Sequence, residues 1–245
     1  MVERAGITQA LEHGPGSRLT LLEAPAGYGK STTIRSWCAT QEAALAWVTL
    51  DSGDDDPVRM WTYIATAVER VEQAGAEVRV RKCPETAPDE VVQSIDAWRT
   101  TAELMANIPE VSHADMEWAN AYLFSAPTRY GVSASQLRAF IDTCGPLWLA
   151  GKLSNKAVSA MTSAMNPHGG QETTLVSLYT TLMHWGTIIV PPGYTDPIQY
   201  KAGGNPYGVT VTTGGPDGGL TPDQEEAIKY QAKRLVEYAG KIAAS

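Results

Sequence analysis

The sequence predicts an α/β protein built on a mainly parallel sheet, and two observations lead to that prediction. Short apolar runs typical of strands alternate along the chain with longer segments in which apolar residues recur at helical spacing. Strands that alternate with helices favour parallel sheets, because each helix returns the chain to the same end of the sheet. The length of 245 residues, 43% of them hydrophobic, is ample for a large core.

The first third of the chain contains three expected strands. Residues 18–23 and 44–50 are apolar runs, and each precedes an expected helix, at 32–40 and from Pro57 to about residue 71. Asp56 caps the second helix, and Pro57 occupies its first position. Residues 76–82 alternate between polar and apolar and predict a third strand, after which 84–112 forms a long polar connection with a short helix at 89–94.

From residue 118 onward the pattern is regular. Strands are expected at 121–125, 156–163 and 187–190, with helices at 133–143 and 171–185. Residues 194–219 are rich in Gly and Pro and predict a loop. Thr221-Pro-Asp-Gln224 is a capping box, and the helix after it places Ile228, Ala232, Leu235, Val236, Ala239 and Ile242 on one face.

Composition excludes several classes of function. The chain has 19 Lys+Arg against 27 Asp+Glu, a net charge of −8, which argues against non-specific binding to nucleic acid or anionic membranes. No apolar run is long enough to span a membrane, and the N-terminus lacks the apolar core of a signal peptide. Three cysteines without a CxxC pair fit a reduced protein, and the His and Cys spacing predicts no metal site. We therefore expect a cytoplasmic protein.

A phosphate-loop motif lies near the start of the chain. Ala24-Pro-Ala-Gly-Tyr-Gly-Lys-Ser31 matches the Walker A pattern between an expected strand and an expected helix. Gly27 and Gly29 would expose backbone N–H groups to a phosphate, Lys30 would meet the terminal phosphates of ATP, and Ser31 would ligate Mg²⁺. An ordinary strand-to-helix turn is the alternative interpretation.

The segment around this motif resembles a known family. Over residues 15–70, EAPAGYGKST followed by AWVTLDSGDDDPVRMWTYIATAV is similar to the nucleotide-binding domain of STAND-type (MalT/LuxR-like) ATPase regulators. No later segment supplies the acidic Walker B strand that hydrolysis needs. This part of the chain therefore predicts an ATP- or GTP-binding switch module without efficient hydrolysis.

The rest of the chain resembles a different family. The blocks Pro127-Thr-Arg-Tyr-Gly131, His168-Gly-Gly-Gln-Glu-Thr-Thr174 and Gly204-Asn-Pro-Tyr-Gly208 occur in the order seen in the WrbA family of FMN-dependent NAD(P)H:quinone oxidoreductases. The resemblance covers about residues 65–243. It implies a flavodoxin-like three-layer sandwich, with FMN at the carboxyl ends of parallel strands and NAD(P)H as electron donor. It also implies two-electron quinone reduction and a homotetramer whose loops complete the site across subunits.

The same resemblance assigns residues to the site. Thr128, Arg129 and Tyr130 would form one loop against the flavin ring, and Ser163, Ala164, Met165, Asn166, Pro167 and His168 the second flavin loop. Trp148 would wall the quinone or nicotinamide pocket, and His184 would lie by the ring, from the same or a neighbouring subunit. Taken singly, each of these residues also fits a structural role, such as a surface ion pair, a core aromatic or a cation at a helix C-terminus.

The sequence departs from this family where the FMN phosphate should bind. Asp51-Ser-Gly-Asp-Asp-Asp56 offers four carboxylates in place of the usual Ser/Gly-rich loop, which predicts weakened flavin binding. The chain thus resembles a chimera, with a P-loop segment at 1–44 and a flavodoxin-like domain at 45–245, of which 45–71 is ATPase-like and 72–245 WrbA-like. Two further alternatives stay open: Gly27–Ser31 could cradle the flavin phosphate, or the chain could be a non-catalytic scaffold.

Overall fold

A central parallel sheet organises the computed structural model, which describes residues 45–49, 76–214 and 219–243. The strands are β1 (Leu45–Thr49), β2 (Val78–Lys82), β3 (Ala121–Ser125), β6 (Ala157–Ala164) and β7 (Ile188–Ile189), in the spatial order β2-β1-β3-β6-β7. The chain therefore winds outward in one direction to β2 and in the other through β3 to β7. This is the flavodoxin-type order that the sequence predicts.

Side chains of β3 alternate between the two faces of the sheet and so take part in two separate cores. Tyr122 and Phe124 pack with the helices of one face, whereas Ala121 and Leu123 pack with those of the other. All five residues of β3 are buried, as expected for a central strand covered on both sides. This strand is predicted with the bounds it has in the structure.

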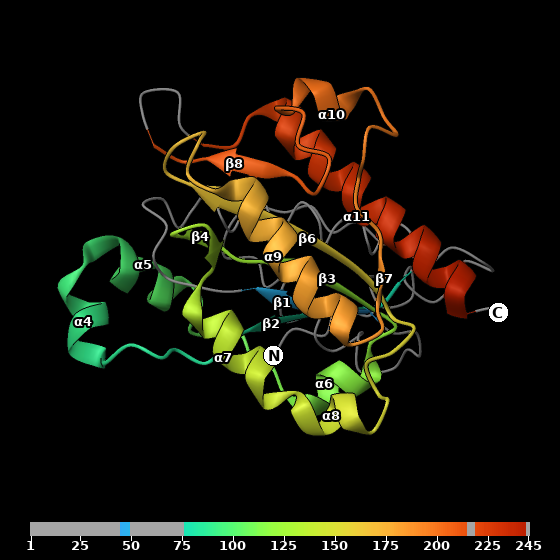
Figure 1. Ribbon diagram of the computed structural model, residues 1–245. Helices are drawn as coiled ribbons and strands as arrows, with labels where there is room; N and C mark the ends of the chain where they lie inside the picture. The colour runs from blue at the N-terminus through green and yellow to red at the C-terminus, as the bar shows by residue number, and fades with distance from the viewer. Residues whose placement is uncertain (1–44, 50–75, 215–218, 244–245) are drawn as a thin grey trace, which may run out of the picture.

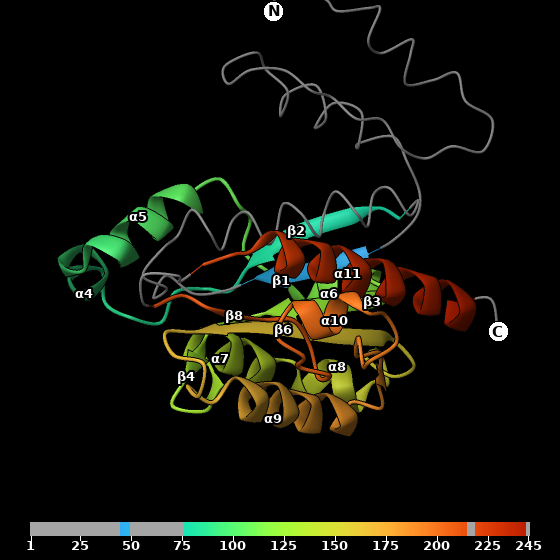
Figure 2. The same cartoon turned by 90° about the horizontal axis from the view of Figure 1, so that it is seen from above.

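Helices cover both faces of the sheet (Figure 2). One layer contains α7 (Ser135–Thr143), α8 (Gly145–Leu149) and α9 (Gln171–His184), and the opposite layer contains α10 (Ile198–Lys201) and α11 (Pro222–Ala243). The predicted apolar face of α11 is confirmed at its centre, where Ile228, Ala232 and Leu235 are buried. Thr221 and Gln224 form the predicted capping contacts in both directions.

The outer edge of β6 changes partner along its length. β7 pairs with Ala157 and Val158, and β8 (Thr210–Thr212) pairs with residues from Thr162 onward. At the gap between them, the backbone N–H of Ala160 donates to the hydroxyl of Tyr179, which itself donates to the carbonyl of Tyr207. Burial raises the pKa of Tyr179 to about 12, so this hydroxyl keeps its proton at neutral pH.

Gln231 completes the same gap from the opposite layer. Its amide nitrogen donates to the Ser159 hydroxyl and to the Ala160 carbonyl, both at 2.8 Å, and its amide oxygen accepts from the N–H of Val209 at 2.8 Å. The side chain is fully buried. Gln231 and Tyr179 together thus replace the strand pairing that β6 lacks at Ala160.

Two segments contain more regular structure than the sequence predicts. The connection 84–112 includes the expected helix α4 (Asp89–Ser94), but also α5 (Asp96–Leu104), and α6 (His113–Trp118) follows it directly. The expected loop 194–219 contains α10 and β8. A small antiparallel hairpin, β4 (Thr128–Arg129) with β5 (Val132–Ser133), precedes α7.

Several predictions lie outside the described residues. They include the strand at 18–23, the helices at 32–40 and 57–71, the phosphate loop at Gly27, Gly29, Lys30 and Ser31, and the acidic loop 51–56. Among the residues that the structure describes, no helix is long and apolar enough to cross a membrane.

Candidate active site at the carboxyl edge of the sheet

The fold directs attention to the edge where β1 and β3 end. In a doubly wound sheet, the chain turns opposite ways from the two central strands, which leaves a crevice between their carboxyl ends. Here β1 pairs with both β2 and β3, and Thr49 at its end lies opposite Ser125 at the end of β3. The carboxyl end of β1 therefore lies beside the start of the loop that follows β3.

The loop after β3 is a tight hairpin with a strained tip. Tyr130 and Gly131 connect β4 to β5 with φ angles of 52° and 85°, so both central residues are left-handed, as a type I′ turn requires. A left-handed conformation is unusual for a bulky aromatic residue and costs roughly 1–2 kcal/mol. The Tyr130 side chain is also completely exposed. Strain and exposure together mark this tip as a functional candidate.

The loop after β6 exposes the residues that the resemblance assigns to flavin. Ser163 and Ala164 are the last residues of β6 and are buried, whereas Met165, Asn166, Pro167 and His168 are exposed. The N–H of Gly169 donates to the carbonyl of Asn166, which closes a turn before α9. A Cβ at Gly169 would stand 2.9 Å from that carbonyl oxygen and 2.8 Å from the Ala164 Cβ, so only glycine fits.

The loops after β3 and β6 contact each other through the glycines Gly131 and Gly170. A Cβ placed on Gly170 would lie 2.8 Å from the Cα of Gly131 and 3.2 Å from its nitrogen. Gly170 also has a φ of 90°, a left-handed conformation that L side chains rarely adopt. The hairpin tip and the start of α9 are therefore fixed relative to one another by backbone contact.

A hydroxyl pair ties the hairpin to β6. The Thr162 hydroxyl donates to the carbonyl of Ala126 at 2.7 Å, so the Thr128 hydroxyl, 3.0 Å away, is the donor to Thr162. The Thr128 side chain is thus occupied within the protein. Nearby, the buried hydroxyl oxygen of Ser133 has no hydrogen-bond partner among the described residues. An unpaired buried hydroxyl costs about 1–3 kcal/mol, which is a second sign that this hairpin is shaped for something besides stability.

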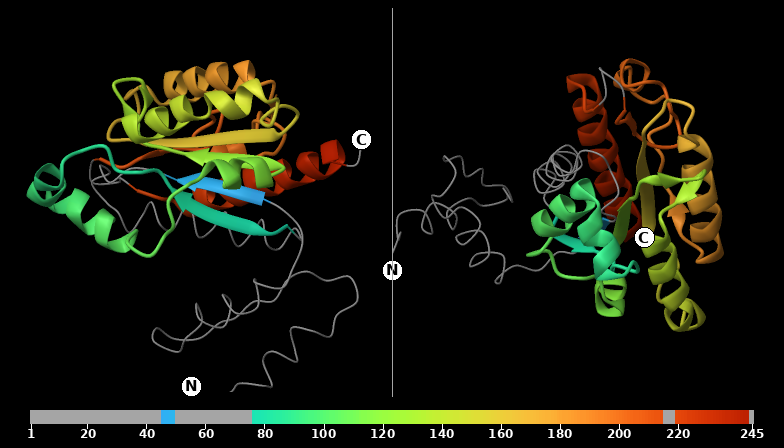
Figure 3. Two further views of the ribbon diagram at one scale, coloured as in Figure 1. Left: turned by 90° about the horizontal axis from the view of Figure 1, so that it is seen from below. Right: turned by 90° about the vertical axis from the view of Figure 1, so that its left-hand side faces the viewer.

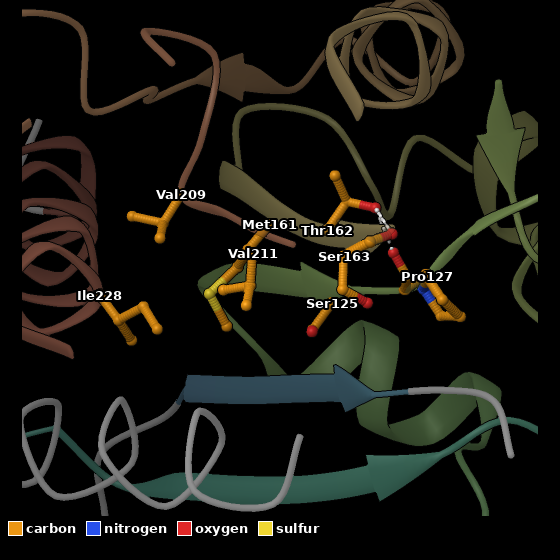
Figure 4. A pocket seen from close by; sticks show the side chains of 9 residues that line it. Ser125, Pro127, Met161, Thr162, Ser163, Val209, Val211 and Ile228 are labelled. Atoms are coloured by element: carbon orange, nitrogen blue, oxygen red, sulfur yellow. Dashed lines mark hydrogen bonds between the residues drawn. The ribbon is translucent and has the colours of Figure 1, made fainter. Parts of the chain in front are cut away.

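The cavity beneath these loops is too small for a ligand ring. Ser125, Thr162 and Ser163 border it on one side and Val209 and Ile228 on the other (Figure 4). Its volume of about 10 Å³ admits no more than one water molecule. A cofactor would therefore lie on the loops rather than in a closed pocket between the described strands.

Trp148 and His184 lie elsewhere. The indole N–H of Trp148 donates to the carbonyl of His184 at 2.8 Å, and both residues line a surface hollow of about 330 Å³. His184 is the last of the 14 residues of α9, whereas the flavin-type loop leads into its first, so the two ends are separated by about 21 Å. Figure 1 shows α9 running along one face of the sheet, with its two ends toward opposite ends of the strands. A single chain does not bring the two predicted residue sets together.

Five residues of this edge are absent from the site predicted from sequence: Gly131, Gly169, Gly170, Thr162 and Ser133. The Gly169-Gly170 pair is a usable signal, because adjacent glycines at a strand-to-helix turn often permit close backbone approach. A buried Thr or Ser gives no such signal. Within the described ranges, no three His, Cys, Asp or Glu residues gather as metal ligands. Burial raises the pKa of Cys144 to about 11, so its thiol stays protonated at neutral pH.

Comparison with known proteins identifies the family. Residues 59–197 match the model of the NADPH-dependent FMN reductase family, which is more than half of the chain. The chain belongs to the NADPH-dependent FMN reductase family. Both loops described above, 126–134 and 165–170, fall within the matched residues.

Three curated relatives of this FMN reductase family member share one name. An NAD(P)H dehydrogenase (quinone) of Deinococcus radiodurans is 53% identical over 176 residues, 72% of this chain and 87% of that protein. A protein of the same name from Geotalea uraniireducens is 38% identical over 191 residues, 76% of this chain and 92% of the relative. A third, from Methanosarcina acetivorans, is 37% identical over 195 residues, 76% of this chain and 91% of the relative.

Solved structures support the fold. A flavodoxin, WrbA-like protein from Agrobacterium tumefaciens superposes with a TM-score of 0.51 at 16% identity, covering 82% of this chain and 99% of that one. RosB, solved with a bound 8-demethyl-8-formylriboflavin-5'-phosphate, gives a TM-score of 0.51 at 13% identity over 82% of this chain and 81% of its own. The predicted flavodoxin-like α/β fold is therefore confirmed for the described part of the chain.

Proposed function

We propose that this chain is an FMN-dependent NAD(P)H:quinone oxidoreductase that reduces quinones by two electrons. The observation that supports it most directly is the glycine-to-glycine contact of two loops at the switch point of a sheet in an FMN reductase family member. The quinone and the nicotinamide donor come from the names of the curated relatives. Bound FMN would supply the chemistry, since it can accept a hydride and return two electrons.

The residues at this edge fit a flavin. The contact between Gly131 and Gly170 and the tight fit of Gly169 hold the hairpin tip and the exposed loop 165–168 in fixed positions, between which a flat ring system could be held. We assign Thr128, Arg129 and Tyr130 to one holding loop and residues 163–168 to the other. Arg129 places a cation at the hairpin, where it would favour negative charge on a bound ligand.

A glycine pair tests the cofactor site. Gly170→Ala puts a methyl group against Gly131, whereas Gly151→Ala meets nothing within 4 Å, although Gly151 has a similarly left-handed φ of 70°. Both variants bear backbone strain, so only loss of the loop contact separates them. We expect Gly170→Ala to weaken FMN binding at least about tenfold in a fluorescence titration, and Gly151→Ala to bind like the parent.

The experiment includes the activity itself. The parent protein, saturated with FMN, should oxidise NADPH when benzoquinone is added and at a much lower rate without it. A flavin-loaded protein that does not reduce quinones would contradict the proposed substrate. A protein that binds no FMN would contradict the proposed cofactor. Equal FMN affinities in the two glycine variants would show that the contact between the loops does not hold the flavin.

Weakened phosphate binding is a further part of the proposal. The acidic sequence 51–56 follows β1, whose end lies at the candidate edge beside Ser125. Carboxylates near a phosphate dianion repel it, and salt screens the repulsion. FMN affinity should therefore rise when Asp54, Asp55 and Asp56 are replaced by Asn, whereas riboflavin, which has no phosphate, should bind both proteins alike.

We also propose that Trp148 and His184 serve the site of a neighbouring subunit in a homotetramer. Their distance from the loops of their own chain and the hollow beside them support this arrangement. Trp148 is half exposed, and Leu149 next to it is 81% exposed, which is a large apolar surface for a free monomer. The tetramer and a cytoplasmic location stay predictions, as does nucleotide binding at Lys30 and Ser31.

A further inference from the structure

The connection 84–111 forms an arm at the end of the molecule where the candidate site lies. Helices α4 and α5 project from the edge of the sheet and lie toward the same end as β4 (Figures 1 and 3). Val92, Thr101 and Met105 of the arm are buried, and Met105 belongs to the core that contains Leu123. The outer surface of the arm exposes Val91, Ile95 and Leu104, each more than 40% accessible.

The Glu85 carboxylate accepts hydrogen bonds both from residues of the arm and from α7, which packs on the sheet. One carboxylate oxygen accepts from the backbone N–H groups of Thr86 and Ala87, at 2.7 and 2.8 Å, and from the side-chain amide of Gln136, at 2.7 Å. The other oxygen accepts from the indole N–H of Trp98, at 3.0 Å. Trp98 belongs to α5, and Gln136 to the first turn of α7, so the carboxylate bridges the two.

Gln136 connects the Glu85 carboxylate to the hairpin formed by β4 and β5. Gln136 is buried and follows Ser133, the last residue of β5, by three positions. A second link runs beside it, since the hydroxyls of Thr86 and Ser135 are 3.5 Å apart and Ser135 donates to the Gln136 amide oxygen at 3.1 Å. The arm is therefore joined to the base of the hairpin that holds Thr128 to Tyr130.

We infer that Glu85 is a positioning residue that sets the arm beside the candidate site, and that the arm's apolar surface shapes the access of quinone. This inference rests on the proposed function. A carboxylate suits the task because it accepts several N–H donors at once and holds them in fixed directions. Glu85 is exposed, but its loss would leave the buried Gln136 amide without this acceptor, so exchange in the arm, and not global stability, is the measure of orientation.

The test pairs Glu85→Ala with Glu90→Ala, an exposed carboxylate on the same arm that removes the same charge. Hydrogen exchange should become faster in peptides covering 89–104 for Glu85→Ala alone, with α9 unchanged in both proteins. In the FMN-loaded enzyme, Glu85→Ala should raise KM for a bulky apolar quinone about threefold or more, leave KM for NADPH unchanged and keep kcat within about twofold.

The position of the arm and its effect on quinone access are tested by separate measurements. Unchanged exchange in the arm would show that Glu85 does not position it, whatever the enzyme reduces. Faster exchange with an unchanged quinone KM would show that the arm does not shape access. A parent protein with no quinone reductase activity would defeat the proposed function, while the exchange measurement would still report on Glu85. Trp98→Phe, which removes only the donor, should reproduce the exchange change and so exclude an unrelated folding defect.

Discussion

Two residues other than glycine have left-handed backbones within the described part of the chain, and they differ in kind. Asn155, with a φ of 62°, is a residue type that often adopts this conformation, whereas Tyr130, with a φ of 52°, is not. Asn followed by Gly is the preferred pair for a type I′ turn. The Tyr130-Gly131 turn is therefore less stable than an Asn-Gly turn would be, and it lies in the hairpin that forms part of the candidate site.

Replacing this tyrosine separates stability from binding. Tyr130→Asn should raise the free energy of unfolding of the FMN-free protein by about 0.5–1 kcal/mol, because it relieves left-handed strain while the fully exposed ring loses no packing. FMN affinity should fall in the same variant. Urea unfolding and a flavin titration measure the two effects, and a variant that lost both stability and affinity would show that the ring packs in the free protein.

Gly208 is the residue at which a methyl group is least acceptable. A Cβ there would lie 2.0 Å from the carbonyl oxygen of Ala160 and 3.1 Å from its carbon, both backbone atoms that cannot turn aside. Gly208→Ala should cost about 2 kcal/mol or more of unfolding free energy. Gly240→Ala is the matched control, since nothing lies within 4 Å of its Cβ and it is in α11, where alanine should stabilise by about 0.5–1 kcal/mol. We expect the urea midpoint to shift down in Gly208→Ala and up in Gly240→Ala, relative to the parent. Equal midpoints in the two variants would contradict the close approach of Gly208 to Ala160.

At the scale of single elements, α6 shows how a six-residue helix is held by its surroundings. Asp115 closes a capping box with Ser112 and pairs with Arg81 of β2 at 2.9 Å. Burial opposes ionisation of this carboxyl, but the bonds from Arg81 and Ser112 outweigh it and lower the pKa of Asp115 below its ordinary value. One carboxylate thus fixes both the start of the helix and its place against the sheet.

This contact predicts a specific dependence on pH. A carboxyl whose pKa is lower in the folded protein contributes stability above its unfolded pKa of about 3.8, and loses it as pH falls through the lower folded value. Asp115→Asn should cost about 1–2 kcal/mol at pH 7 and progressively less below pH 4. Urea unfolding from pH 3 to 7 measures this, with the exposed pair residue Asp96→Asn as control. A difference between parent and Asp115→Asn that is constant with pH would contradict the assignment.

The elements that sequence predicts well are those with a local signal. The strand at 121–125 is an apolar run, and α11 begins at a capping box and places apolar residues at helical spacing. α5 lacks such a signal, whereas α6 begins at a capping box of Ser112 and Asp115 that the sequence prediction missed. α5 is largely polar, and α6 depends on an arginine from β2, more than thirty residues earlier. β8 has only three residues, two of them threonines, and exists because it continues the edge of β6.

For the whole molecule, one part of the candidate site is predictable from local motifs and another part is not. The hairpin and the second loop are contiguous motifs, so their residues are close in space because they are close in sequence and end neighbouring strands. Trp148 and His184 belong to motifs of equal clarity, yet they lie at the far end of α9. In a parallel α/β unit the helix returns the chain to the amino ends of the strands, so the place of His184 at the end of α9 is itself a signal that it lies away from the flavin loops of its own chain. Which subunit supplies a residue is not contained in the order of motifs.

Mixing two inactive variants decides how the molecule assembles its site. Trp148→Ala removes the aromatic wall, and Gly170→Val removes the loop contact, so each homo-oligomer should be inactive with FMN and quinone present. If a site combines the loops of one subunit with Trp148 of one neighbour, random co-assembly in equal amounts leaves about a quarter of the sites with both intact partners. Co-expressed variants should therefore regain about a quarter of the parent activity per site. If each chain serves its own site, the mixture stays as inactive as its parents, because no chain carries both intact residues.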